Sequence, residues 1–245
     1  MPSLVDTNEK VRWAKKHLDA LYEHVRFLAS QLNPDCVSAY DDLETSEHVV
    51  KLTLPKATFD AALIAGDFVS CLRSSLDYLA WQLAKLTVDE PSGKICFPVF
   101  EEDSLKTQLR ITELTYGIPD EAIVIIKSLQ PYRYLSAYHI CSLWKLHNLW
   151  NIVKHRHIGA VSRITAIDMP GIIPEPKAEA IDNGYIMRFP LSAKPQVSFN
   201  PMPPVTVDIE FGDRRKGPVV TIGHLAEIYQ VVSTAVIPRF ERFFR

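Results

Sequence analysis

The sequence predicts an α+β fold that is predominantly helical: a helical bundle with an N-terminal β-hairpin and a small antiparallel sheet inserted before the last helix. Three observations support this class. Apolar residues recur at helical spacing over most of residues 6–157 and again over 222–244. Alternating segments flank a polar turn near residues 36–54. Residues 160–220 hold about half of the 17 prolines together with β-branched runs, which is typical of strands with irregular connections.

We expect one domain over residues 1–245. Its helical core should comprise about 6–32, 57–86, 101–157 and 222–244, and its β elements about 36–54 and 158–212. The first helix ends where Asn33-Pro34 interrupts the pattern. The hairpin has Glu44-Thr45-Ser46 as its turn. The second helix has an apolar stripe of eight residues: Ile64, Phe68, Cys71, Leu72, Leu76, Leu79, Leu83 and Leu86.

After the second helix we expect a short extended segment over residues 95–100. Pro98 within it argues against a central strand. Shorter helices are expected near residues 101–110 and 119–128, where Pro119 suits a first-turn position. Gln130-Pro131-Tyr132 then breaks the pattern before a helix over about 137–155. Later strands and the last helix complete the fold. We expect the strands over 160–167, 184–190, 197–200 and 205–211, and a last helix kinked at Pro238.

Composition excludes several classes of function. The formal net charge of −2 gives no global basic field, so any nucleic-acid contact needs a local patch. No apolar run approaches the roughly 20 residues that span a bilayer, so we expect no membrane partner. The four cysteines are far apart, and no paired spacing indicates zinc. We therefore expect a cytoplasmic protein with reduced cysteines and without metal or cofactor.

The helix near residues 137–155 carries the densest group of polar residues. Its apolar stripe contains Leu143, Leu146, Trp150 and Val153. Three side chains at spacings of four residues share another face, and four basic or imidazole groups crowd the helix end. The face consists of His147, Asn151 and His155, and the end consists of Lys154, His155, Arg156 and His157.

Two interpretations of the cationic helix end remain open. Cations at a helix C-terminus interact favourably with the helix dipole, by about 0.3–1 kcal/mol each, and need no further role. Alternatively, Lys154, Arg156, His147 and His157 bind an anion or a phosphate. In that case His155 acts as a general base, a role that suits the ordinary pKa of histidine.

Arg73 and Asp77 stand four residues apart on the second helix. They form either an ordinary surface pair or, because their surroundings are apolar, a partly buried pair that needs partners. In a cross-helix network, Asp77 would orient His155 or bond Asn151, and Arg73 would point at an acceptor. The candidate catalytic residues are therefore His155, Arg73, Asp77 and Asn151.

Several segments together resemble a known family. They are Leu72-Arg73-Ser74-Ser75-Leu76-Asp77-Tyr78-Leu79-Ala80-Trp81, Phe97-Pro98, Gln130-Pro131-Tyr132 and Asn151-Ile152-Val153-Lys154-His155-Arg156. In order and spacing over about residues 50–160, they resemble a widespread bacterial family of uncharacterised proteins with the elements LRSALDHLAW, FP, QPY and NxDKHR. The resemblance implies no particular activity. Val153 stands where that family usually has an acidic residue, so any chemistry that uses the acid would be lost here.

More distantly, the expected bundle resembles the HEPN superfamily of nucleotide-binding and RNA-cleaving proteins. Their motif is an arginine followed a few residues later by a histidine, and Arg133 and His139 have such a spacing. This resemblance implies RNA or a nucleotide as partner and a metal-independent ribonuclease activity. A histidine would act on the 2′-hydroxyl and an arginine would stabilise the phosphorane, roles open to His155 with Arg156 or Arg73.

Three functions therefore remain open. The polar residues hold together the fold of a cytoplasmic protein, or the protein is an HEPN-like RNA-binding or RNA-cleaving protein of a toxin–antitoxin or defence system. The third is a protein–protein or small-ligand binding module. A homodimer that placed two Lys154–His157 ends side by side would favour nucleic acid, because it would double a local basic patch.

Overall fold

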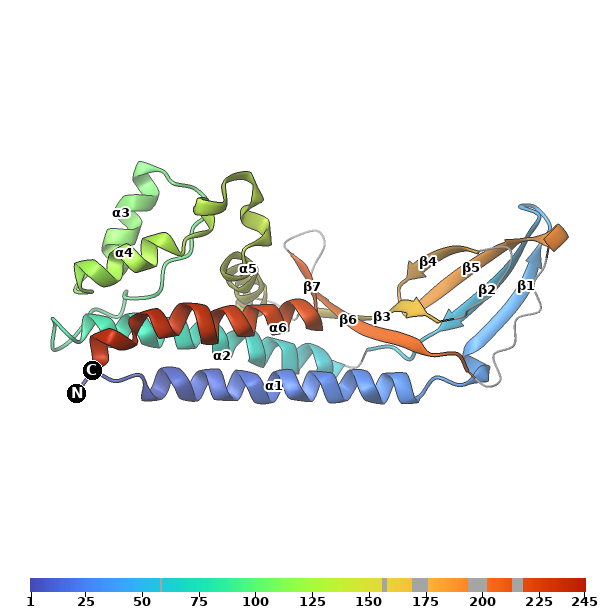
Figure 1. Ribbon diagram of the computed structural model, residues 1–245, viewed down its shortest axis with the longest axis horizontal. Coiled ribbons are helices and arrows are strands. Elements are labelled where there is room, and N and C mark those ends of the chain that lie inside the picture. Colours follow the sequence, from blue (N-terminus) through green and yellow to red (C-terminus); the bar gives the residue numbers. More distant parts are fainter. Residues whose placement is uncertain (58, 156–157, 169–175, 194–201, 213–217) are drawn as a thin grey trace. The chain divides into compact units, whose positions relative to one another are not determined.

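A computed structural model describes residues 1–57, 59–155, 158–168, 176–193, 202–212 and 218–245. The chain forms two compact units. Unit 1 comprises residues 1–19, 63–158 and 212–245, and unit 2 comprises residues 20–62 and 159–211. The fold class is the predicted one, with helices, an N-terminal hairpin and two small antiparallel sheets (Figure 1).

Most helices begin and end close to their predicted positions. Two begin later than expected. Ser104 caps one of them, because its side chain accepts a hydrogen bond from the Thr107 backbone N–H at 3.2 Å. The other begins only at Ser142, because Pro131–Ile140 forms 3₁₀ turns with Leu135 at a φ of 51°. The helices are α1 (Val5–Ser30), α2 (Phe59–Ala84), α3 (Leu105–Leu114), α4 (Asp120–Ser128), α5 (Ser142–His155) and α6 (Ile222–Gln230).

The core of unit 1 forms around α2. The predicted stripe is confirmed for the residues that are fully buried: Phe68, Leu72, Leu76, Leu79 and Leu83. The prediction is wrong for the last residue of the stripe, Leu86, which lies beyond the end of α2 and is exposed. Burying such side chains stabilises the fold by roughly 1.5–3 kcal/mol each, so this face fixes the position of α2 within the unit.

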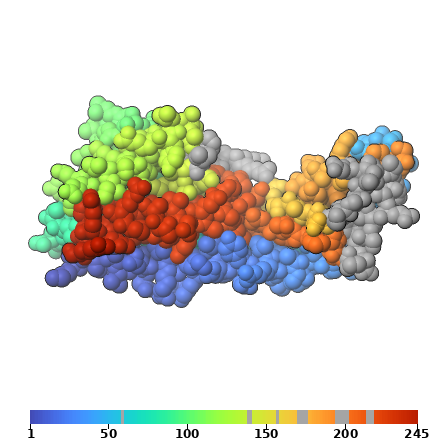
Figure 2. Space-filling view, viewed as in Figure 1, coloured from blue at the N-terminus to red at the C-terminus, as the bar shows by residue number. Residues whose placement is uncertain are grey.

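The C-terminal segment confirms the predicted step at Pro238. After α6 the chain continues as π-helical turns over Val231–Val236 and then as 3₁₀ turns over Ile237–Phe244, with Pro238 in the first turn. Phe240 is buried and meets Phe97 edge to face, with ring centroids 6.4 Å apart. This segment, red in Figure 2, forms part of the surface of unit 1 while its apolar side reaches the core.

The hairpin joins later strands in unit 2. Its strands β1 (Val37–Asp42) and β2 (Glu47–Thr53) belong to an antiparallel sheet of order β1-β2-β5-β4, with β4 at Lys177–Ile181 and β5 at Gly184–Pro190. Val50 lies opposite Met187, and both pack with Phe189 in a buried cluster. The strand β4 was not predicted because its sequence, KAEAI, has few β-branched residues.

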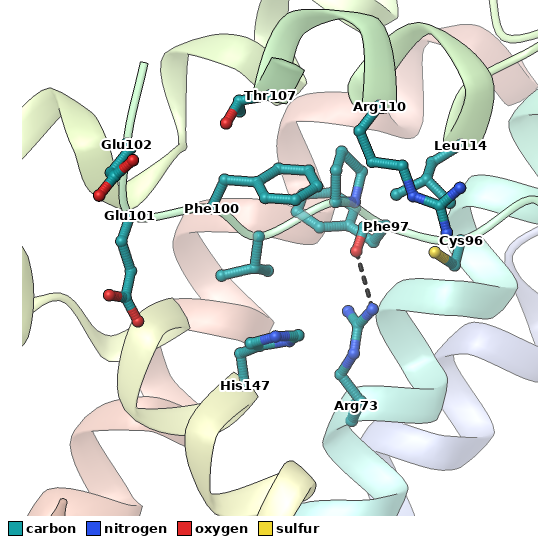
Figure 3. A pocket seen from close by; sticks show the side chains of 12 residues that line it. Arg73, Cys96, Phe97, Phe100, Glu101, Glu102, Thr107, Arg110, Leu114 and His147 are labelled. Carbon is teal, nitrogen blue, oxygen red and sulfur yellow. Dashed lines mark hydrogen bonds between the residues drawn. The ribbon is translucent and has the colours of Figure 1, made fainter. Parts of the chain in front are cut away.

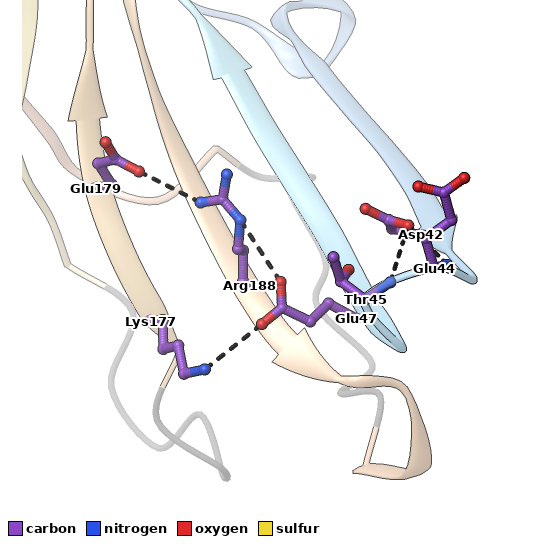
Figure 4. A network of polar contacts seen from close by, with 7 residues as sticks. All are labelled: Asp42, Glu44, Thr45, Glu47, Lys177, Glu179 and Arg188. Atoms are coloured by element: carbon purple, nitrogen blue, oxygen red, sulfur yellow. Dashed lines mark hydrogen bonds and ion pairs between the residues drawn. The ribbon is translucent and has the colours of Figure 1, made fainter.

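Ion pairs link the strands β2, β5 and β4 of this sheet (Figure 4). Glu47 lies 3.6 Å from both Lys177 and Arg188, and Arg188 lies 3.4 Å from Glu179. In the turn, backbone hydrogen bonds from Thr45 and its neighbour hold the pKa of Asp42 below its ordinary value. Partly exposed ion pairs of this kind contribute little to stability.

A second antiparallel sheet has the order β3-β6-β7. Its strands are β3 (Gly159–Ile167), β6 (Val205–Gly212) and β7 (Val219–Thr221). The strands β3 and β6 confirm their predictions, and β7 is too short to have given a periodic signal. The predicted strand over 197–200 lies outside the described residues.

Candidate functional site

Arg73 and Asp77 form a largely buried ion pair on α2. Arg73 is only 3% exposed, and its Nη2 lies 2.9 Å from Asp77 Oδ1. The same Nη2 donates to the Phe97 carbonyl at 2.8 Å, and the Phe97 N–H donates to Asp77 Oδ1 at 3.0 Å. The pair therefore satisfies both backbone groups of Phe97. Of the two interpretations of this i,i+4 spacing, the partly buried pair is the one that the structure contains.

A buried glutamine secures the other end of the same extended segment. Gln130 has no exposed surface, its Oε1 accepts from the Phe100 N–H at 3.0 Å, and its Nε2 donates to the Pro98 carbonyl at 2.8 Å. Side chains thus take the place of a strand partner for this segment, as Pro98 led us to expect. Sequence reasoning treated Gln130 only as part of a turn. Its position between an apolar helix and a proline was the one available signal.

A pocket of about 480 Å³ lies beside the ion pair. It is lined by Arg73 of α2, residues 96–102, part of α3 and His147 of α5 (Figure 3). Arg73 and His147 come from different helices and border the same space. Arg73 Nε, Arg73 Nη1 and His147 Nδ1 are buried and have no hydrogen-bond partner among the described residues. The pocket therefore combines concavity with unsatisfied hydrogen-bonding capacity.

His147 is neutral at pH 7. Burial is the main cause that lowers its pKa to about 4, the positive charge of Arg73 acts in the same direction, and Glu101 acts against both. Trp150 lies beside both groups, with its ring centroid 5.4 Å from Arg73 Cζ and 6.2 Å from the His147 ring. An aromatic face next to a guanidinium holds its plane in place by a cation–π interaction.

Only the first member of the predicted polar face reaches this pocket. Asn151 and His155 are exposed, as is Lys154, whose Nζ lies 5.1 Å from the Trp150 ring centroid. The helix geometry explains the difference: four residues exceed the 3.6 of one turn, so each step of four moves about 40° further around the axis. His147 therefore lies at the edge of the buried face, and His155 lies well away from it.

The polar contacts of Arg73 and Asp77 differ from those predicted between α2 and α5. The partners of Asp77 in the described structure are Arg73 and Phe97, and neither His155 nor Asn151 is among them. Arg73 instead approaches α5 through Trp150. The predicted anion-binding candidates Arg156 and His157 lie outside the described residues.

Of the pair suggested by the HEPN resemblance, Arg133 and His139, the structure describes the side chain of Arg133 alone. Arg133 is exposed in the 3₁₀ turns, and its Nε donates to the Lys127 carbonyl at 3.4 Å. The side chain of His139 lies outside the described residues. Arg133 is not among the residues that line the Arg73 pocket.

The chemistry of the pocket favours binding over nucleophilic attack. Burial raises the pKa of the Cys96 thiol, so the only thiol lining the pocket stays protonated. Burial also raises the pKa of Asp77, although Arg73 and the Phe97 N–H oppose this change. Among the residues that the structure describes, no cluster of histidine, cysteine and acidic side chains could hold a metal, and no helix could cross a membrane.

Comparisons with protein-family models, with curated proteins and with solved structures find no match to this chain. The resemblances to the bacterial LRSALDHLAW family and to the HEPN superfamily therefore stay predictions.

Proposed function

We propose that this protein is a small-ligand binding module whose pocket at Arg73 takes the carboxylate of an organic acid. The observation that carries the proposal is a guanidinium group, only 3% exposed, with two nitrogens that have no acceptor among the described residues. A buried donor without a partner costs about 1–3 kcal/mol, and more when it is charged. A carboxylate that accepts from one of these nitrogens would offset part of that cost with a charge-assisted hydrogen bond.

The charges around the pocket disfavour a ligand with more than one negative charge. Asp77 already balances the charge of Arg73, and Glu101 and Glu102 also line the pocket. A dianionic phosphate would meet this acidic surrounding at a larger electrostatic cost than a carboxylate would. Neutral His147 can contribute one further hydrogen bond to the ligand.

The structural and the binding roles use different atoms of Arg73. Its Nη2 holds Asp77 and the Phe97 carbonyl, while Nε and Nη1 are the nitrogens left over. Arg73 can therefore hold the fold together, as in the first of the three functions, and bind a ligand at the same time. RNA binding remains as an alternative outcome of the experiment below.

We expect acetate to bind wild-type protein with a Kd near the millimolar range, because each of its few non-hydrogen atoms contributes at most about 1.5 kcal/mol. Arg73→Lys should weaken this binding about tenfold or more. Lysine can still pair with Asp77, but its ammonium supplies no donors at the positions of Nε and Nη1. An NMR titration with acetate measures both affinities, and urea unfolding confirms that the variant is folded.

Arg12→Lys is the matched control, because Arg12 forms an exposed ion pair with Glu9 on α1, at 2.5 Å. It should leave acetate binding unchanged. Inorganic phosphate should bind more weakly than acetate. The proposal is overturned if acetate does not bind, or if folded Arg73→Lys binds it as well as wild type does. Tight binding of a short single-stranded RNA without acetate binding would favour the RNA alternative instead.

A further inference from the structure

A second hollow adjoins the Arg73 pocket. It measures about 710 Å³ and runs along α3. Four residues line both hollows: Phe100, Glu102, Thr107 and Arg110. Because they share these four residues, the two hollows are neighbours. Together they are called the cleft, with the Arg73 pocket as its inner part and the hollow along α3 as its outer part.

The outer part of this cleft has an apolar lip. Leu105 and Leu109 line it and are 78% and 65% exposed. They are four residues apart on α3 and therefore share one face of that helix. Single exposed leucines are ordinary, but two on one face of a concave surface form an apolar patch at which burial of a ligand would be favourable.

Polar as well as apolar side chains line the outer part of the cleft. Arg110 pairs with Glu113 through Nη1, at 2.5 Å, so its guanidinium is already engaged. Its aliphatic stem remains available to line the cleft, as long charged side chains commonly do. Phe100, labelled in Figure 3, adds an aromatic side chain to the lining of both hollows.

We propose that the ligand is an amphiphile, a straight-chain carboxylic acid whose head binds Arg73 and whose hydrocarbon chain lies between Phe100 and the Leu105–Leu109 face of α3. This inference rests on the proposed function, because the carboxylate site fixes one end of the chain. The neighbouring hollow along α3 then determines where the chain runs. A short acid fills only the inner part of the cleft, and a longer one covers the exposed leucines as well.

The test compares acetate, butyrate, hexanoate and octanoate by isothermal titration calorimetry and NMR with the full-length protein. A buried methylene contributes up to about 0.8 kcal/mol, or about fourfold in affinity, and an open cleft gives less. At twofold or more for each of six added methylenes, octanoate should bind at least about 60-fold more tightly than acetate. Leu109→Ser should reduce this ratio at least about fivefold and leave acetate affinity unchanged, because the exposed leucine does not touch the inner pocket.

Val124→Ser is the matched control, because Val124 is 68% exposed on α4 and does not line the cleft. It should preserve the full dependence on chain length. Equal affinities for acetate and octanoate in wild type would overturn this inference and leave the carboxylate site intact. The same holds for a chain-length dependence that Leu109→Ser leaves unchanged. Absence of binding by every acid would overturn the proposed function itself.

Discussion

Arg73→Met should lower the free energy of unfolding by about 3 kcal/mol at pH 7, because removal of one partner from a buried ion pair leaves the other charge unpaired. Asp77 would keep only the Phe97 N–H, and the Phe97 carbonyl would lose its described side-chain donor. Urea unfolding followed by circular dichroism measures the change.

Lys15→Met is the matched control for this substitution. Lys15 and Asp19 have the same i,i+4 spacing at 2.5 Å, but their side chains are 47% and 56% exposed, against 4% for that of Arg73. The control should cost less than about 1 kcal/mol. The double variant Arg73→Met with Asp77→Leu should cost less than the sum of its single changes, since no buried charge then remains. Equal costs at Arg73 and Lys15 would contradict the buried pair.

Stability should fall as the pH drops from about 6.5 to about 4. Burial lowers the pKa of His147 from 6.5 to about 4 in the folded protein. Between these values the unfolded chain binds one more proton than the folded protein, so acidification favours unfolding. The loss should reach about 2 kcal/mol, after allowance for partial contact of the ring with solvent. Above pH 6.5 this contribution vanishes because His147 is neutral in both states.

His147→Gln isolates this effect from the other titrating groups. Asp77 acts in the opposite sense: burial raises its pKa, so the folded protein takes up its proton at a higher pH than the unfolded chain does. Arg73 and Glu101 remain in both proteins, so the difference between their unfolding curves from pH 7.5 to pH 4 reports His147 alone. Parallel pH dependences would show that His147 is not buried beside Arg73.

Most helices and strands could be predicted from the sequence, because each depends on a pattern of neighbouring residues. Helical spacing identified α2 with its buried leucines, and alternation identified the β1–β2 hairpin. The pairing of β2 with β5, more than 100 residues later, was not readable, because strand pairing depends on contacts distant in sequence. Short or polar strands such as β4 gave no periodic signal.

The site could be predicted only in part, because it forms from residues that are far apart in the sequence. The spacing of Arg73 and Asp77 showed that they share a helix face, but not that Phe97 and Gln130 would join them. His147 was recognised as part of a polar face, yet that face turns away from the pocket as α5 continues. The cleft along α3 depends on how separate elements pack, and no pattern of neighbouring residues in the sequence indicates this packing.

The most direct test of the carboxylate site is the NMR signal of the Arg73 Nε–H group during titration with hexanoate. Arg73→Lys deletes this signal and so identifies it. Formation of a hydrogen bond to a carboxylate should move the proton resonance downfield, in a saturable manner and with the same Kd that calorimetry gives. A signal that stays in place while hexanoate binds would contradict the account, because the acid would then occupy another site.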